Sequence, residues 1–179
     1  MTGDLLDAST GVIMGIDYAH HEVHSGSHYT YSEFFSLGDG DEKELIIITP
    51  DTTKWAHMLF AVNGALHTTV KAFEDTTWAS TGTDFSSLIL NNNRNSDNTA
   101  GVTIRGKGAT GTDANLIFSG QFGNDSGNGA TRLVSGGSVR GDAEWVLKQN
   151  SKYLLTITSL SAANELALVL SWYEHRDKL

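Results

Sequence analysis

The chain contains no cysteine and a single proline, Pro50. Without cysteine, a disulfide framework, a thiolate metal site and a cysteine nucleophile are all excluded. No apolar run approaches the roughly 18 residues of a membrane-spanning helix, so no membrane partner is expected. The first fifteen residues hold no lysine or arginine, which excludes the basic start of an ordinary signal peptide. We therefore expect a protein stabilised by packing alone, or by packing against copies and partners.

Positive charge is also scarce. There are 12 basic and 21 acidic residues, which gives a formal net charge of −9 at pH 7. Proteins that coat nucleic acid need lysine and arginine to neutralise phosphates. A chain this acidic is poorly suited to that task, so no nucleic-acid partner is expected.

Length and composition favour one all-β domain. The 179 residues fit the size of a single domain with a real core. Glycine occurs 19 times, and serine, threonine and asparagine are also common. These residues are poor helix formers that supply turns and half-buried strands. Turn signals at intervals of about eight to twelve residues predict an antiparallel β-sandwich or barrel.

The pattern along the chain predicts a short N-terminal arm over residues 1–16 and a single β-sandwich domain over residues 17–179. Asn63–Gly64 lies between two apolar runs and predicts a hairpin turn. Residues 91–141 are rich in glycine and asparagine and predict long loops with three short strands. The strands are expected at residues 18–24, 28–37, 43–49, 55–62, 65–73, 102–104, 116–118, 133–134, 143–148, 153–159 and 165–174.

Four of the seven histidines fall close together near the start of the predicted domain. On a strand, His20, Glu22 and His24 share one face, and imidazole and carboxylate ligands suit zinc or a similar ion. A solvated strand face or a polar interface explains the same residues without a metal. We favour that second interpretation, so no metal and no cofactor is predicted, and these three residues stay the candidate ligands.

The sequence lacks the motifs of common enzyme classes. It has no G-x-S-x-G, no P-loop and no HExxH. The segment at residues 105–108, RGKG, lacks the strand–loop–helix context of a phosphate site, so a plain loop is expected. We therefore predict no catalytic residues and a protein that is not an enzyme.

The four tryptophans divide by context. Trp55, Trp145 and Trp172 lie inside apolar strands and are expected in the core. Trp78 lies in the threonine- and serine-rich stretch DTTWASTG and is expected to be a partly exposed contact.

Three separated segments carry a resemblance to a known family. These are YAHHEVHSGSHYT, LNNNRNSDN and KYLLTITSL with LALVLSWYEH, in that order from about Tyr18 to His175. Together they resemble the head decoration (cement) proteins of tailed bacteriophages. The resemblance implies a jelly-roll β-sandwich that forms a homotrimer and binds the major capsid protein. It also implies a place on the capsid exterior of the virion after assembly in the host cytoplasm, and no catalytic residues.

Three other functions stay open. A carbohydrate-binding jelly roll requires exposed tryptophan or tyrosine on a concave face. A tail or fibre component of a virion would share the same fold and composition. A metal-dependent enzyme on this fold requires an inward-facing histidine set with an open coordination position.

Overall fold

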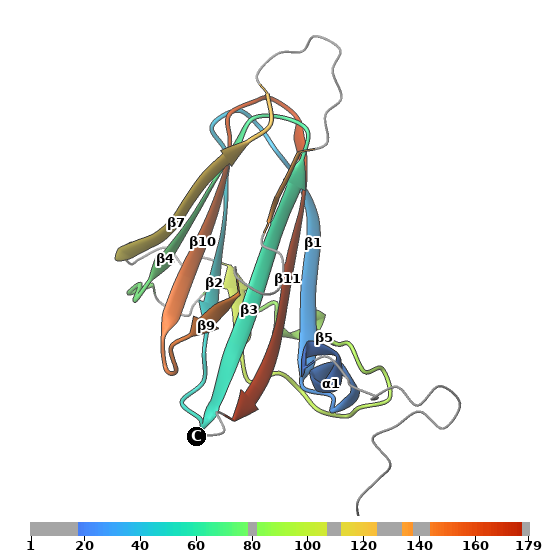
Figure 1. Ribbon diagram of the computed structural model, residues 1–179. Helices are drawn as coiled ribbons and strands as arrows, with labels where there is room; N and C mark the ends of the chain where they lie inside the picture. The colour runs from blue at the N-terminus through green and yellow to red at the C-terminus, as the bar shows by residue number, and fades with distance from the viewer. Residues whose placement is uncertain (1–17, 79–81, 107–111, 125–133, 138–143, 177–179) are drawn as a thin grey trace, which may run out of the picture.

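The computed structural model of the chain describes residues 18–78, 82–106, 112–124, 134–137 and 144–176. They form two antiparallel sheets that face each other as a sandwich (Figure 1). In spatial order, the first sheet contains β5 (Leu90–Asn91), β1 (His28–Leu37), β11 (Asn164–Arg176), β3 (Lys54–Gly64) and β8 (Val134–Gly137), and β9 (Trp145–Leu147) also pairs with β3. The second sheet contains β6 (Thr103–Gly106), β2 (Glu42–Ile48), β10 (Lys152–Ser159), β4 (Thr68–Glu74) and β7 (Asn115–Phe122).

From β1 to β6, and again from β9 to β11, consecutive strands alternate between the two sheets. The order β1-β11-β3-β8 in one sheet faces β2-β10-β4-β7 in the other. This is the strand order of a jelly roll, in which two Greek keys interlock. The prediction of an all-β antiparallel sandwich of jelly-roll type is therefore confirmed.

The core lies between the sheets because the strands alternate apolar and polar residues. On β11, Leu166, Leu168 and Leu170 are fully buried, while the residues between them point to the outer face of the first sheet. Leu155 and Ile157 of β10 meet them from the other sheet. Burial of each such side chain stabilises the fold by about 1.5–3 kcal/mol.

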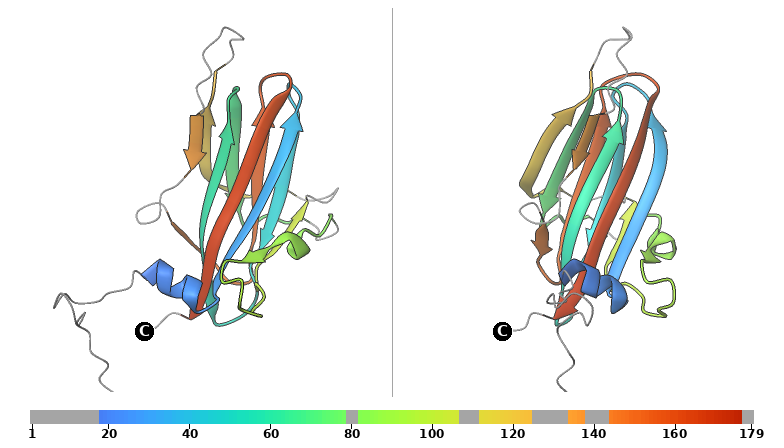
Figure 2. Two further views of the ribbon diagram at one scale, coloured as in Figure 1. Left: turned by 90° about the vertical axis from the view of Figure 1, so that its right-hand side faces the viewer. Right: turned by 45° about the vertical axis from the view of Figure 1, so that its right-hand side comes forward.

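The segment of residues 18–24 is a helix, α1 (Tyr18–His24), so the predicted strand there is wrong. The helix ends where Gly26 takes a positive φ of 73°, a conformation that glycine adopts without strain. Figure 2 shows α1 crossing the lower ends of β1 and β11. Within the described residues, no helix is long and apolar enough to cross a bilayer.

The predicted hairpin at Asn63–Gly64 is also wrong. Strand β3 continues through Gly64, and the next residues carry the chain across to β4 in the other sheet. A Cβ atom on Gly64 would lie 2.4 Å from Leu166 Cδ2. Glycine stands at this position because of close packing against β11, rather than because of a hairpin turn.

The loop-rich middle of the chain contains more strand than expected. β7 has eight residues where a short strand was predicted, and β5 and the 3₁₀ turn η1 (Ser86–Leu88) were not predicted. The predicted arm, residues 1–16, lies outside the described residues.

Two of the four tryptophan predictions are wrong. Trp172 is fully buried and Trp145 packs against the core, as expected. Trp55 is 40% exposed because it lies on the outer face of the first sheet. Trp78 is only 7% exposed because it covers Ile46 and Leu154 on the outer face of the second sheet.

Candidate functional sites

Helix α1 brings His20 and His24 together one turn apart. Their Nε2 atoms are 3.0 Å apart, and the rings stack with centroids 4.8 Å apart and planes within 4°. Both side chains are exposed. Glu22 lies on the buried side of the helix, 5% exposed, where Ser25 Oγ donates a hydrogen bond of 3.4 Å to its Oε2 atom. The helix therefore separates the three predicted metal ligands, because only residues three or four apart share a helical face.

Two imidazole nitrogens alone do not complete a metal site. Structural zinc takes four ligands, and catalytic zinc takes three from the protein. Among the described residues, no group of three or more histidine or acidic side chains is placed to hold a metal ion.

A ring array crosses the outer face of the first sheet. His28, Tyr173 and His57 are paired neighbours on β1, β11 and β3, and His175 lies beside them. The Tyr173 ring centroid is 4.7 Å from that of His57 and 6.5 Å from that of His28, and His57 and His175 are 4.5 Å apart. The Tyr173 hydroxyl donates to Glu144 Oε2 at 2.9 Å. The array therefore fixes the Glu144 carboxylate just before β9.

An open groove of about 310 Å³ lies where the two sheets separate beside β7 and β9. Glu74, Glu144 and Tyr153 supply its polar atoms, and Trp145, Ile117, Val146 and Leu147 complete its lining. Burial raises the pKa of Tyr153 above its ordinary value, and its hydrogen bond to Glu74 raises the pKa further. The Tyr153 hydroxyl therefore stays neutral and donates to Glu74 Oε1 at 3.1 Å. Lys148 Nζ lies 2.7 Å from the other Glu74 oxygen.

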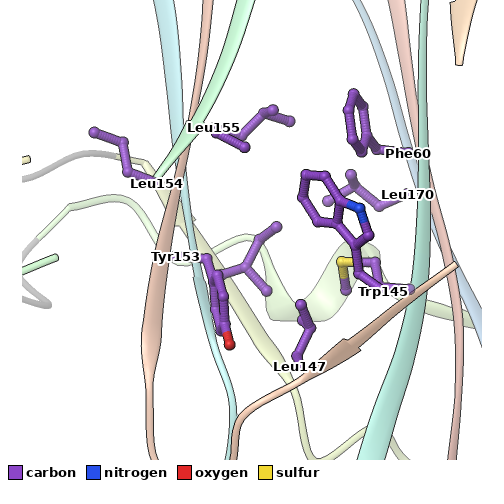
Figure 3. Close-up of a pocket in the computed structure, with 10 residues that line it drawn as sticks. Phe60, Trp145, Leu147, Tyr153, Leu154, Leu155 and Leu170 are labelled. Carbon is purple, nitrogen blue, oxygen red and sulfur yellow. The ribbon is translucent and has the colours of Figure 1, made fainter. Parts of the chain in front are cut away.

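Behind this groove is a small apolar cavity of about 20 Å³ (Figure 3). Trp145, Leu147 and Tyr153 line both spaces. A cavity of this volume admits about one water molecule, and its apolar lining offers that water no stable partners. It is a gap in the core packing rather than a ligand site.

The two lateral edges of the sandwich carry exposed apolar side chains. We call the edge formed by β7 and β9 the β7 edge, and the edge formed by η1 and β5 the β5 edge. The β7 edge exposes Leu116 (54%), Ile117 (41%), Phe118 (37%) and Val146 (48%). The β5 edge exposes Leu88 (53%) and Leu90 (51%). Neither edge was predicted, although the two corresponding windows, residues 114–124 and 85–93, contain no charged residue.

A buried carboxylate links β11 to the segment just before β6 by hydrogen bonds. Glu174 is 4% exposed and lies on β11. Its oxygens accept hydrogen bonds from the backbone N–H groups of Gly101 and Val102 and from the Trp172 indole N–H, at 2.9–3.0 Å. These partners satisfy the carboxylate, so Glu174 has a structural role that no local sequence pattern indicated.

Comparison of the chain with protein-family models, with curated proteins and with solved structures found no match.

Proposed function

We propose that the chain is a non-enzymatic structural protein of a virion, which decorates a phage capsid as a homotrimer. In this proposal it binds the outside of the shell of major capsid protein. The observation that carries the proposed homotrimer is the exposed apolar surface along the two lateral edges, where Leu116, Leu88 and Leu90 are more than half exposed. Contiguous exposed apolar surface is typical of protein interfaces. The segments that resemble cement proteins point to a capsid as the partner.

Attachment of such a protein depends on several contacts acting together. A trimer that offers the same surface three times binds a repeating shell far more tightly than one copy does. Weak individual contacts are then enough for stable attachment. The proposed location is the capsid exterior, after assembly in the host cytoplasm.

The test uses empty shells of the major capsid protein encoded in the same genome as this chain, purified without it. Purified chain is mixed with the shells at increasing concentration, and the pellet is analysed after sedimentation. We expect binding that saturates at a fixed number of chains per capsid subunit. A pellet free of the chain at all concentrations would overturn the proposal.

The groove favours carbohydrate binding as a second candidate. It places two carboxylates, Glu74 and Glu144, beside the hydroxyl of Tyr153 and the Trp145 ring. Carboxylates accept hydrogen bonds from sugar hydroxyls, and aromatic rings stack against sugar faces. A glycan screen tests this function, with Glu74→Gln as the groove variant and Glu165→Gln, exposed on β11, as its control. Loss of a glycan signal in Glu74→Gln alone would support it, and an empty screen would remove it.

A further inference from the structure

We propose that copies of this chain associate side by side, with the β7 edge of one copy against the β5 edge of the next. This inference deepens the homotrimer of the proposed function and rests on it, because it names the two surfaces that join the copies.

The two edges lie on opposite sides of the sandwich. In the first sheet, β5 is at one end of the strand order and β8 and β9 are at the other. In the second sheet, β7 is at the end that matches β8 and β9. Figure 1 shows β7 and β5 on opposite sides of the molecule. A contact between unlike edges can therefore repeat from copy to copy.

Charge favours these edges over the rest of the surface. Copies with a net charge of −9 repel each other, and the repulsion is smallest where neither surface is charged. The windows of residues 114–124 and 85–93 contain no lysine, arginine, aspartate or glutamate. Exposed edge strands normally carry charge or proline, which prevents unwanted pairing. Neither β7 nor the η1–β5 segment carries a charge of its own, and charged residues beside them are already paired, Asp84 with Arg105 and Glu74 with Lys148. A partner that covers the two segments accounts for this.

The apolar side chains are also concentrated there. Six of the nine large apolar side chains found exposed among the described residues lie on the two edges. The other three, Phe34, Trp55 and Leu160, are separate from one another in the chain. Isolated exposed residues are normal, whereas a concentration of exposed apolar side chains at one sheet end indicates an interface.

Both edges are held in place by the fold. On the β7 edge, the Phe118 ring packs edge-on to Phe60, with centroids 5.1 Å apart. On the β5 edge, the backbone N–H of Phe85 donates to the Ile104 carbonyl, and Arg105 pairs with Asp84 at 2.7 Å. Preorganised surfaces lose little conformational entropy when they associate.

Contact between unlike edges explains more than contact between like edges. If β7 paired with β7 of a second copy, Leu88 and Leu90 would stay exposed in every copy. If the two unlike edges meet, every copy covers both. Such head-to-tail contacts produce a closed ring when the rotation between copies closes, and a trimer is one such ring.

The experiment measures mass in solution by light scattering across a range of protein concentrations. The variants are Ile117→Lys on the β7 edge and Leu90→Lys on the β5 edge. Leu160→Lys, at a 38% exposed site on neither edge, is the matched control. We expect wild type and the control to assemble above the 19.3 kDa monomer mass. Each edge variant should need about 100-fold more protein to assemble, because a lysine without a partner is buried in an apolar contact.

Mixing the two edge variants separates unlike from like contacts. Each variant keeps one intact edge, and the two intact edges are complementary, so the mixture should form a dimer of one copy of each. Leu90→Lys that assembles like wild type, or a mixture that stays monomeric, would overturn the inference. If Ile117→Lys loses its β-sheet circular dichroism, Leu116→Lys replaces it at a more exposed position. A wild-type chain that stays monomeric in solution yet binds shells overturns this inference and leaves the proposed binding to the capsid shell standing. An oligomer that does not bind shells overturns the proposed function and leaves the contact between copies standing.

Discussion

Glu174 is the residue whose replacement the structure predicts in most detail. Its carboxylate accepts from three N–H groups, and two of the donors, those of Val102 and Trp172, belong to residues no more than 1% exposed. Hydrogen bonds to a charged group contribute about 1.5–3 kcal/mol each, and a buried donor left without an acceptor costs about 1–3 kcal/mol. Relief of the cost of burying the carboxylate offsets part of this loss. Glu174→Ala should therefore lower the free energy of unfolding by about 3–5 kcal/mol.

Glu174→Gln separates charge from shape. The amide has nearly the same size but replaces one acceptor oxygen by a donor, which at the Oε2 position faces the Gly101 N–H. We expect a loss of about 2–4 kcal/mol. Glu165→Gln, exposed on the same strand, should change the free energy of unfolding by less than about 0.5 kcal/mol.

Urea unfolding followed by tryptophan fluorescence measures both changes, with circular dichroism as the second probe. The two probes should give coincident transitions if unfolding is two-state. A Glu174→Gln protein within about 1 kcal/mol of wild type would refute the reasoning, because neither the charge nor the second acceptor oxygen would then matter.

Three further substitutions or conditions test other parts of the fold. Gly123→Ala should cost about 2 kcal/mol or more in unfolding free energy, because φ is 85° and a Cβ would lie 2.1 Å from the Leu66 carbonyl oxygen; a neutral result in urea unfolding contradicts this. Trp78→Ala should cost about 3–5 kcal/mol, while Trp55→Ala should cost much less; equal midpoints in thermal unfolding would show that the assigned burial is wrong. Burial, and then the Glu174 charge, raises the pKa of Tyr29 from 10.0 to about 12. The pKa of Tyr29 is higher in the folded than in the unfolded chain, so the stability it contributes is complete below pH 10 and is lost as the pH rises through about 12. Tyrosinate absorbance is titrated in wild type and in Tyr29→Phe. If the group that the variant lacks titrates at the ordinary tyrosine pKa, the prediction is wrong.

The strands could be predicted where apolar alternation is long. Residues 28–37 are rich in aromatic residues that partly alternate with polar ones, and β1 has these bounds. In residues 18–24 the strand prediction depended only on the spacing of His20, Glu22 and His24. A helix also places residues four apart, such as His20 and His24, on one face, so this spacing does not distinguish a strand from a helix. The helix ends just before Gly26, whose positive φ lets the chain turn into β1. The spacing of apolar residues in this segment does not indicate that turn.

Which face of a strand is covered could not be predicted from the strand alone. Trp55 and Trp172 both lie in apolar strands, yet only the second points between the sheets. Trp78 lies in a polar segment but covers an apolar patch formed by strands far away in the chain. In each case the pairing of distant strands sets the burial, and no local window contains it.

The candidate sites likewise depend on residues that are far apart in the sequence. The backbone groups that satisfy Glu174 are more than seventy residues away, and the rings of the array come from three strands, so neither has a local signal. Helix α1 brings His20 and His24 together, whereas the wrong strand prediction also grouped Glu22 with them, which lies on the buried side of the helix. A wrong secondary structure thus changes which side chains are grouped, even where the residues themselves are well chosen.

The lateral edges had a signal in the sequence, but its meaning depends on topology. The windows of residues 85–93 and 114–124 contain no Asp, Glu, Lys or Arg and each hold three apolar residues in a row, but residues 55–70 share both features. Taken alone, each window is compatible with a buried core strand. Strand order removes that interpretation, because it places both windows at sheet ends, where Leu90 and Leu116 are more than half exposed. The proposed side-by-side association accounts for these exposed apolar segments, because each copy would cover the sheet end of the next.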